Sequence, residues 1–135
     1  MTRVRVGTTN QIPPGQVMGF QIRLGRAAGE PPLVIGPASE ESPPGTVAVT
    51  VVQTKDGDWY GLGGLCTHRP AVLSEGFVED CQLECPRHGA RFDLATGGVL
   101  AGPATEAVAT YQVVVADDVV YLEIEPSGGA GSGQV

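Results

Sequence analysis

Short runs of alternating hydrophobic and polar residues recur along the chain, and they predict β-strands. Residues 3–6 (RVRV) alternate in this way, and Met18, Phe20, Ile22 and Leu24 alternate with polar or small residues. Successive side chains of a strand point to opposite faces, so a period of two indicates one buried face. We therefore expect a first strand at 3–6 and a half-buried second strand from about residue 18 to residue 24.

β-Branched runs and turn residues predict further strands in the middle and near the end of the chain. Asp56-Gly57 is a dipeptide that favours a tight hairpin turn, and it separates two strand-like runs. Two more such runs are expected to pair around Asp117-Asp118. The predicted strands are 46–53 (TVAVTVVQ), 59–62 (WYGL), 110–115 (TYQVVV) and 119–124 (VVYLEI).

A proline-rich segment at about 26–45 interrupts this pattern. It holds five prolines, each of which removes a backbone donor and disfavours helix at the residue before it. We expect a long loop that Leu33, Val34 and Ile35 fix to the body of the domain. Two interpretations remain open: an ordinary surface insertion, or an arm that docks a partner, because long loops in compact domains are often functional.

Composition narrows the fold class. The 135 residues suit one domain, and 20 glycines with 11 prolines indicate many turns. No long segment shows helical periodicity, so we predict a single all-β domain over residues 1–125, followed by a flexible tail at 126–135 (PSGGAGSGQV).

Charge and targeting signals limit the possible partners. The formal net charge is −7, and an acidic chain is a poor general ligand for nucleic acid or anionic membrane. The sequence shows no signal peptide and no apolar stretch near the about 18 residues of a membrane span. Three cysteines, an odd number, argue against a disulfide framework. We therefore expect a cytoplasmic protein that binds neither nucleic acid nor membrane.

The candidate chemistry lies in two short segments that pair a thiol with an imidazole. GLCTHRP contains Cys66 and His68, and LECPRHG contains Cys85 and His88, the only histidines of the chain. Two thiolates and two imidazoles can hold a tetrahedral zinc ion or an iron–sulfur cluster. Each segment supplies one ligand of each kind, which suits a binuclear cluster with thiolates on one iron and imidazoles on the other. Zinc in a structural interaction domain remains an alternative.

The pattern C-T-H, sixteen residues, C-P-R-H-G resembles the signature of the Rieske [2Fe-2S] family. The resemblance implies an all-β Rieske fold, with an antiparallel β base and a small cluster-binding subdomain at about 63–101. It implies that Cys66 and Cys85 bind the inner iron of one [2Fe-2S] cluster, and His68 and His88 the outer iron. Gly102-Pro103-Ala104 matches the proline loop that lies over the cluster in this family.

Four positions bear on the class of Rieske protein. High-potential members have a disulfide between the two ligand loops, and the matching residues here are Ala71 and Arg87. They also have serine and tyrosine hydroxyls that donate to cluster sulfur, where this chain has Ala90 and Phe92. Hydrogen bonds to sulfur stabilise the reduced cluster. We therefore predict a low reduction potential, about −150 mV.

A small Rieske protein of this kind resembles the ferredoxin component of bacterial ring-hydroxylating oxygenase systems. The resemblance implies a one-electron carrier, not a catalyst, that takes an electron from a flavoprotein reductase and passes it to a terminal non-heme iron oxygenase. No flavin-binding fingerprint is present, and no histidine remains for a mononuclear iron. The alternative within the family is the small subunit of an enzyme such as assimilatory nitrite reductase.

Residues beside the ligand histidines are candidates for partner docking. Arg69, Arg87 and Arg91 each lie within three residues of a ligand histidine, and Pro103 lies in the expected proline loop. If the arginines surround the exposed imidazoles, they form a basic tip on an acidic body and steer docking to an acidic patch. The alternative is that they are scattered solvated residues. The Arg69-Pro70 pair and the segment 26–45 depart from the usual ferredoxin pattern and leave the specific partner open.

Overall fold

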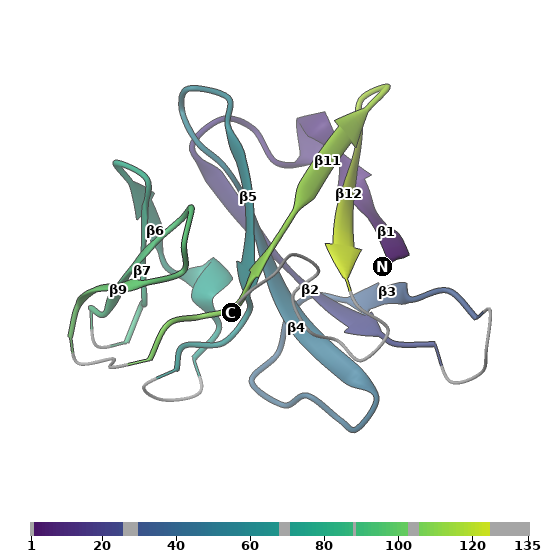
Figure 1. The fold of residues 1–135 in the computed structure, drawn as a ribbon, viewed down its shortest axis with the longest axis horizontal. Coiled ribbons are helices and arrows are strands. Elements are labelled where there is room, and N and C mark those ends of the chain that lie inside the picture. Colours follow the sequence, from purple (N-terminus) through teal and green to yellow (C-terminus); the bar gives the residue numbers. More distant parts are fainter. Residues whose placement is uncertain (1, 26–29, 68–70, 88, 103–105, 125–135) are drawn as a thin grey trace.

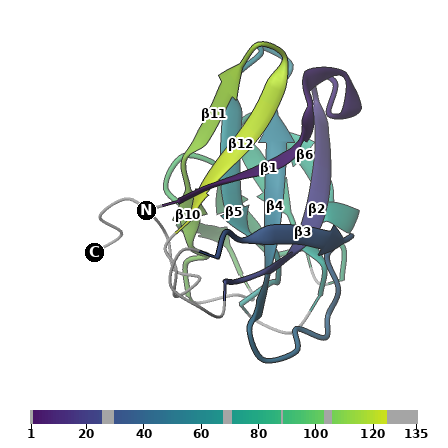
Figure 2. The same ribbon diagram turned by 90° about the vertical axis from the view of Figure 1, so that its right-hand side faces the viewer.

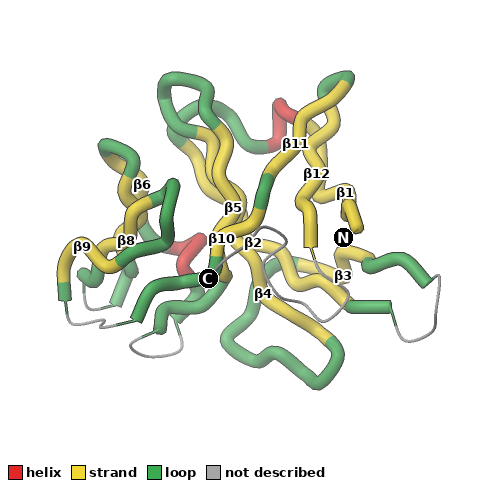
Figure 3. The backbone as a smooth tube through the Cα atoms, in the orientation of Figure 1, coloured by secondary structure: helices red, strands yellow, loops and turns green. Residues whose placement is uncertain are grey.

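A computed structural model describes residues 2–25, 30–67, 71–87, 89–102 and 106–124. Its strands form three antiparallel sheets, shown in Figures 1 and 3, and two short 3₁₀ helices, η1 (Thr9–Gln11) and η2 (Leu73–Glu75), connect some of them. The strands are β1 (Thr2–Thr8), β2 (Gln16–Arg23), β3 (Leu33–Gly36), β4 (Thr46–Gln53), β5 (Trp59–Gly63), β6 (Phe77–Glu79), β7 (Gln82–Glu84), β8 (Arg91–Asp93), β9 (Val99–Ala101), β10 (Thr110–Tyr111), β11 (Val113–Ala116) and β12 (Val119–Ile124). The prediction of an all-β fold is therefore confirmed.

The largest sheet has five strands in the order β10-β5-β4-β2-β3. Its central strand β4 is covered on both faces, because Val49 and Val51 belong to one hydrophobic core and Val52 belongs to a second. Burial of both faces explains why its sequence is a nearly continuous β-branched run. The expectation that β2 is half-buried is wrong at Gly19–Ile22, which is buried throughout. The face of β2 that carries Gly19 and Gln21 is covered by other segments of the chain, and the alternating pattern of β2 does not predict this cover.

A three-stranded sheet, β1-β12-β11, closes over one face of the five-stranded sheet, as Figures 1 and 2 show. Its β11–β12 hairpin turns at Asp117 and Asp118, both with positive φ, as in the tight turns that suit hairpins. The predicted strand 110–115 is divided at Gln112: Tyr111 pairs with Gly61 of β5, whereas Val113 pairs with Leu122 of β12. This change of partner joins the two sheets around one core.

The third sheet contains four short strands in the order β6-β7-β8-β9, and it lies to one side of the other two (Figure 1). Leu83 and Phe92 are directly paired on its inner face, and both are fully buried. They belong to a core that also includes Val52 and Leu62 of the large sheet. Burial of these side chains fixes the small sheet against the base, which positions the two loops that carry the cysteines.

The proline-rich segment contains a strand, so the prediction of a loop throughout 26–45 is wrong at residues 33–36. β3 pairs with β2 at the edge of the large sheet, with Val34 beside Ile22. Leu33 and Ile35 are about half exposed, while Val34 packs into the core. The prolines on both sides limit the strand to four residues. Prolines are tolerated near an edge strand because the backbone groups on its outer side need no partner strand.

Candidate metal centre

Cys66 and Cys85 occupy equivalent positions in two hairpin loops. The amide of Cys66 donates to the carbonyl of Ala71 at 3.0 Å, and the amide of Cys85 donates to the carbonyl of Ala90 at 2.7 Å. The flanking residues pair in the same way, Leu65 with Val72 and Glu84 with Arg91. Each loop therefore encloses the four residues between its cysteine and its alanine.

The two thiols are buried in one apolar environment. Cys66 is 6% exposed and Cys85 is 2% exposed, and no disulfide joins either of them to another cysteine. Both belong to the core beneath the small sheet, together with Val52, Leu62, Ala71, Leu73, Leu83, Ala90, Phe92, Leu94 and Val108. A pair of soft ligands in a site that excludes water suits a thiolate-bound iron.

Ala90 and Phe92 form part of this environment. Both are fully buried, and neither side chain carries a hydroxyl that could donate a hydrogen bond to sulfur. Ala90 closes the second loop through its bond with Cys85, and Phe92 lies two residues further along, paired with Leu83. Phe92 therefore helps to exclude water from the cysteine side of the site.

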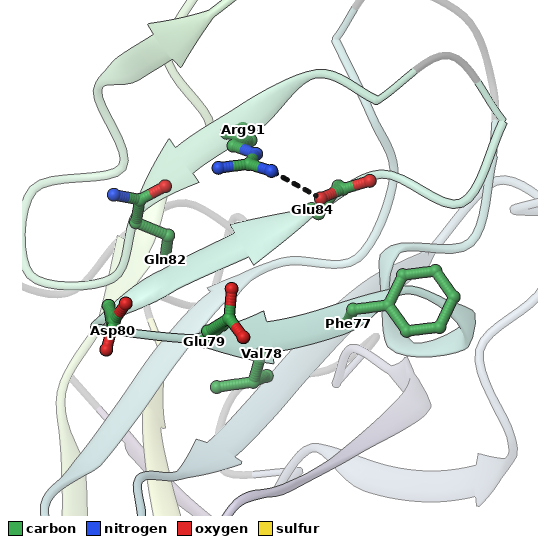
Figure 4. A pocket seen from close by; sticks show the side chains of 7 residues that line it. All are labelled: Phe77, Val78, Glu79, Asp80, Gln82, Glu84 and Arg91. Atoms are coloured by element: carbon green, nitrogen blue, oxygen red, sulfur yellow. Dashed lines mark ion pairs between the residues drawn. The ribbon is translucent and has the colours of Figure 1, made fainter.

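The outer face of the small sheet carries Phe77 beside charged side chains. Phe77 pairs with Glu84, and Glu84 pairs with Arg91, so the three side chains follow one another across β6, β7 and β8. They line a shallow hollow of about 400 Å³, shown in Figure 4 with the ion pair of 3.2 Å between Arg91 and Glu84. The Arg91 guanidinium, expected from the sequence to take part in docking, thus has a carboxylate partner one residue before Cys85.

Arg87 in the second loop also has a carboxylate partner. Its guanidinium lies 2.6 Å from Glu40, which belongs to the proline-rich segment. Sequence reasoning missed Glu40 because the two partners are 47 positions apart in the chain and no local pattern links them. In the first loop, the Thr67 hydroxyl donates to the carbonyl of Glu106 at 2.6 Å, another long-range contact that had no sequence signal.

Several of the predicted site residues lie outside the described part of the chain. These are His68, Arg69, His88 and Pro103. Among the predicted ligands, the structure therefore brings together Cys66 and Cys85, in two loops of the same form beside one core. The third cysteine, Cys81, is exposed in the β6–β7 turn, where it and Asp80 have positive φ.

The donor set fits a Rieske cluster. When bound, such a cluster supplies a reversible one-electron redox step, while the protein supplies position and electrostatics. Cys66 and Cys85 provide the buried thiolates, and His68 and His88 follow them in the same loops as candidate imidazole ligands.

Comparisons with known proteins agree with this chemistry. The model of the family described as Rieske [2Fe-2S] domain matches residues 2–112. The ferredoxin component of a naphthalene 1,2-dioxygenase system from Pseudomonas aeruginosa is 36% identical over 91 residues, which cover 62% of this chain and 88% of that protein.

Solved structures give the same assignment. The ferredoxin of carbazole 1,9a-dioxygenase from Nocardioides aromaticivorans IC177 superposes with a TM-score of 0.68 at 31% identity, covering 90% of this chain and 97% of that one. A chain in a complex of reduced oxygenase and oxidized ferredoxin in carbazole 1,9a-dioxygenase superposes with a TM-score of 0.63 at 25% identity, covering 88% of this chain and 99% of that one. This protein belongs to the Rieske [2Fe-2S] domain family, and it is an electron carrier with a Rieske-type cluster rather than a catalyst on its own.

Proposed function

We propose that this protein is the low-potential ferredoxin of a ring-hydroxylating oxygenase system. In this role it takes one electron from a flavoprotein reductase and passes it to a terminal non-heme iron oxygenase. The observation that carries the proposal is the pair of matching loops, each with a buried cysteine, in a small all-β protein. The names of its relatives, ferredoxin components of dioxygenase systems, favour this role over that of a small nitrite reductase subunit.

The assignment of His68 and His88 as the ligands of the outer iron is part of the same proposal. Their spacing from Cys66 and Cys85 supports it, because each histidine falls within the four residues that its loop encloses. Imidazole ligands on one iron raise the potential of a Rieske cluster above that of an all-thiolate ferredoxin. Replacement of either histidine by cysteine is therefore expected to lower the potential or to abolish assembly.

The low potential rests on Ala90 and Phe92. Their buried side chains offer no hydroxyl to a cluster sulfur, so the extra negative charge of the reduced cluster is less stabilised. We expect a midpoint of about −150 mV, near the lower limit of the Rieske range. A redox titration that gives a clearly positive midpoint would contradict this part of the proposal.

A cytoplasmic location is part of the proposal, because the flavoprotein reductase proposed as the electron donor would draw its electrons from a nicotinamide cofactor of the cytoplasm. In the described part of the chain, no helix has the length and apolar character needed to cross a bilayer.

Reconstitution tests the function directly. The purified protein would be reduced by a flavoprotein reductase with NADH and then mixed with an oxygenase component of a naphthalene-type system. We expect a coloured protein with a spin-half EPR signal after reduction, and substrate hydroxylation that depends on its presence. A protein that takes up the cluster but donates electrons to no oxygenase would exclude the proposed partner.

A further inference from the structure

The loop between β3 and β4, residues 37–45, is held in place by the buried side chain of Gln21. The Gln21 amide nitrogen donates to the hydroxyls of Ser42 at 2.9 Å and Thr46 at 3.1 Å. Its amide oxygen accepts from the backbone amide of Ser39 at 3.1 Å. Gln21 is 5% exposed, and a buried polar group that is paired in this way orders the residues that bind it.

The same loop is packed and closed at its ends. A Cβ atom added to Gly19 of β2 would lie 2.8 Å from the Cβ of Ala38. Ala38 of the loop can therefore lie this close to β2 only because residue 19 is a glycine. The carbonyl of Gly45 accepts from the Leu24 amide at 2.8 Å, and the carbonyl of Pro43 accepts from the Thr46 amide at 3.0 Å. Glu40 therefore projects from a loop that is attached to β2 on both sides of it.

The side chain of Glu40 extends from the loop at residues 37–45 to the second ligand loop. Its carboxylate lies 2.6 Å from the guanidinium of Arg87, which stands between Cys85 and His88 in the sequence. Both side chains are about half exposed, so the pair contributes little to stability, at most about 1 kcal/mol. Its main consequence is electrostatic: a carboxylate from a distant segment offsets the guanidinium that precedes His88 in the sequence.

We propose that this loop is a specificity element of the docking face, in which Glu40 neutralises Arg87 so that the face accepts a redox partner with a cationic surface. The inference rests on the proposed electron-transfer function. The loop carries two neighbouring carboxylates, those of Glu40 and Glu41, whereas Arg87 supplies one guanidinium. The whole chain has a net charge of −7. Complementary charge mainly accelerates encounter and suppresses wrong partners.

Small redox probes of opposite charge measure the field at the docking face without any protein partner. Reduced protein would be oxidised in stopped flow by hexaammineruthenium(III), a cation, and by ferricyanide, an anion. Each probe takes one electron and leaves the oxidised protein with ruthenium(II) or ferrocyanide. The ratio of the two rate constants is the readout, because a change of reduction potential affects both rates in the same direction.

The variants are E40Q, R87Q, the double variant E40Q/R87Q and the matched control E41Q. We expect E40Q to lower the cation-to-anion ratio about two- to fivefold at low ionic strength, and R87Q to raise it by a similar factor. The effect of E40Q should shrink in the R87Q background if the two side chains act as a pair. E41Q should lower the ratio without any such dependence on Arg87.

A second measurement concerns the protein partner. The dissociation constant for the oxygenase component, at low and high salt, should rise for E40Q and fall for R87Q, while the melting temperatures shift by no more than a few degrees. The opposite signs would show that Arg87 steers an acidic partner and would overturn the proposal. Equal effects of E40Q and E41Q, with no coupling to Arg87, would also overturn it. Failure to bind any oxygenase, with the probe results as expected, would instead refute the proposed function.

Discussion

The amide of Cys85 donates to the carbonyl of Ala90 at 2.7 Å, and Cys66 makes the same bond with Ala71 at 3.0 Å. Each bond closes a loop at its first and last residue, so the cysteine is fixed by its own backbone as well as by the surrounding core. This closure places the two thiols at the first residue of two hairpin loops that are closed by the same type of backbone hydrogen bond, which suits a shared pair of ligands.

Loss of either buried cysteine should abolish cluster assembly. Cys66→Ser and Cys85→Ser replace a soft thiolate with a hydroxyl, which is a poor ligand for iron in a cluster. Cys81→Ser is the matched control, because Cys81 is exposed in a turn. Iron and acid-labile sulfide analysis should show loss in the first two variants and full content in the third. Retention of the cluster in Cys85→Ser would refute the ligand assignment.

Hydroxyls introduced beside the cysteines should raise the reduction potential. Ala90→Ser and Phe92→Tyr each place a donor in a fully buried position, where an unpaired hydroxyl is unfavourable and a sulfur acceptor is favoured. We expect increases on the order of 50–100 mV each, part of the about 450 mV span of Rieske centres. Redox titration followed by EPR measures the change.

Ala48→Ser is the control for this pair. Ala48 is also buried, but it lies on β4 of the large sheet and outside the core that contains the cysteines. Its replacement should leave the potential unchanged. An unchanged potential in both Ala90→Ser and Phe92→Tyr would show that the missing hydroxyls do not account for a low potential.

Gly76 should tolerate no side chain. A Cβ atom there would lie 1.9 Å from the carbonyl oxygen of Glu84, the residue before Cys85. Gly76→Ala must therefore displace the backbone of β7, and we expect a loss of about 1–3 kcal/mol in the free energy of unfolding, with reduced cluster content. Denaturant unfolding and iron analysis measure both effects.

Gly36→Ala is the matched control, because a Cβ atom added to Gly36 would meet no other atom within 4 Å and the backbone there has no positive φ. We expect its free energy of unfolding to stay within about 0.5 kcal/mol of the parent. A Gly76→Ala protein as stable as this control would contradict the packing argument.

Stability should fall at alkaline pH because of Tyr111. Burial raises the pKa of Tyr111 above its usual value of 10.0, since the charged phenolate is disfavoured in the core. The unfolded chain ionises first, so the contribution of Tyr111 is fully present below about pH 10 and is lost as the pH rises through the higher pKa of the folded state.

Tyr111→Phe should flatten this dependence, although its stability at neutral pH can differ from that of the parent. The free energy of unfolding, measured from about pH 8 to about pH 11, should decline less steeply above about pH 10 in the variant. Equal slopes in the two proteins would show that Tyr111 ionises as readily in the folded state as in the unfolded chain.

Local sequence patterns predicted most of the strands for a clear physical reason. The runs 46–53 and 119–124 are rich in β-branched residues, and the turn at Asp117-Asp118 suits residues that adopt positive φ. The four-residue strand in the proline-rich segment was missed because its prolines argue against a strand. It is stabilised by its pairing with β2 at the sheet edge, from Leu33 to Gly36, and by the packing of Val34 into the core.

The sequence by itself determined the identity and spacing of the cysteines and histidines, and these limited the cofactor to a zinc ion or an iron–sulfur cluster, because metal chemistry depends on the ligand atoms. Tertiary structure decided how the loops that carry them are closed, which core buries Cys66 and Cys85, and that Glu40 lies beside Arg87. It also decided that the strand around Gln112 changes sheets. These features depend on contacts between residues far apart in the chain, where packing and charge act through space and leave no local pattern.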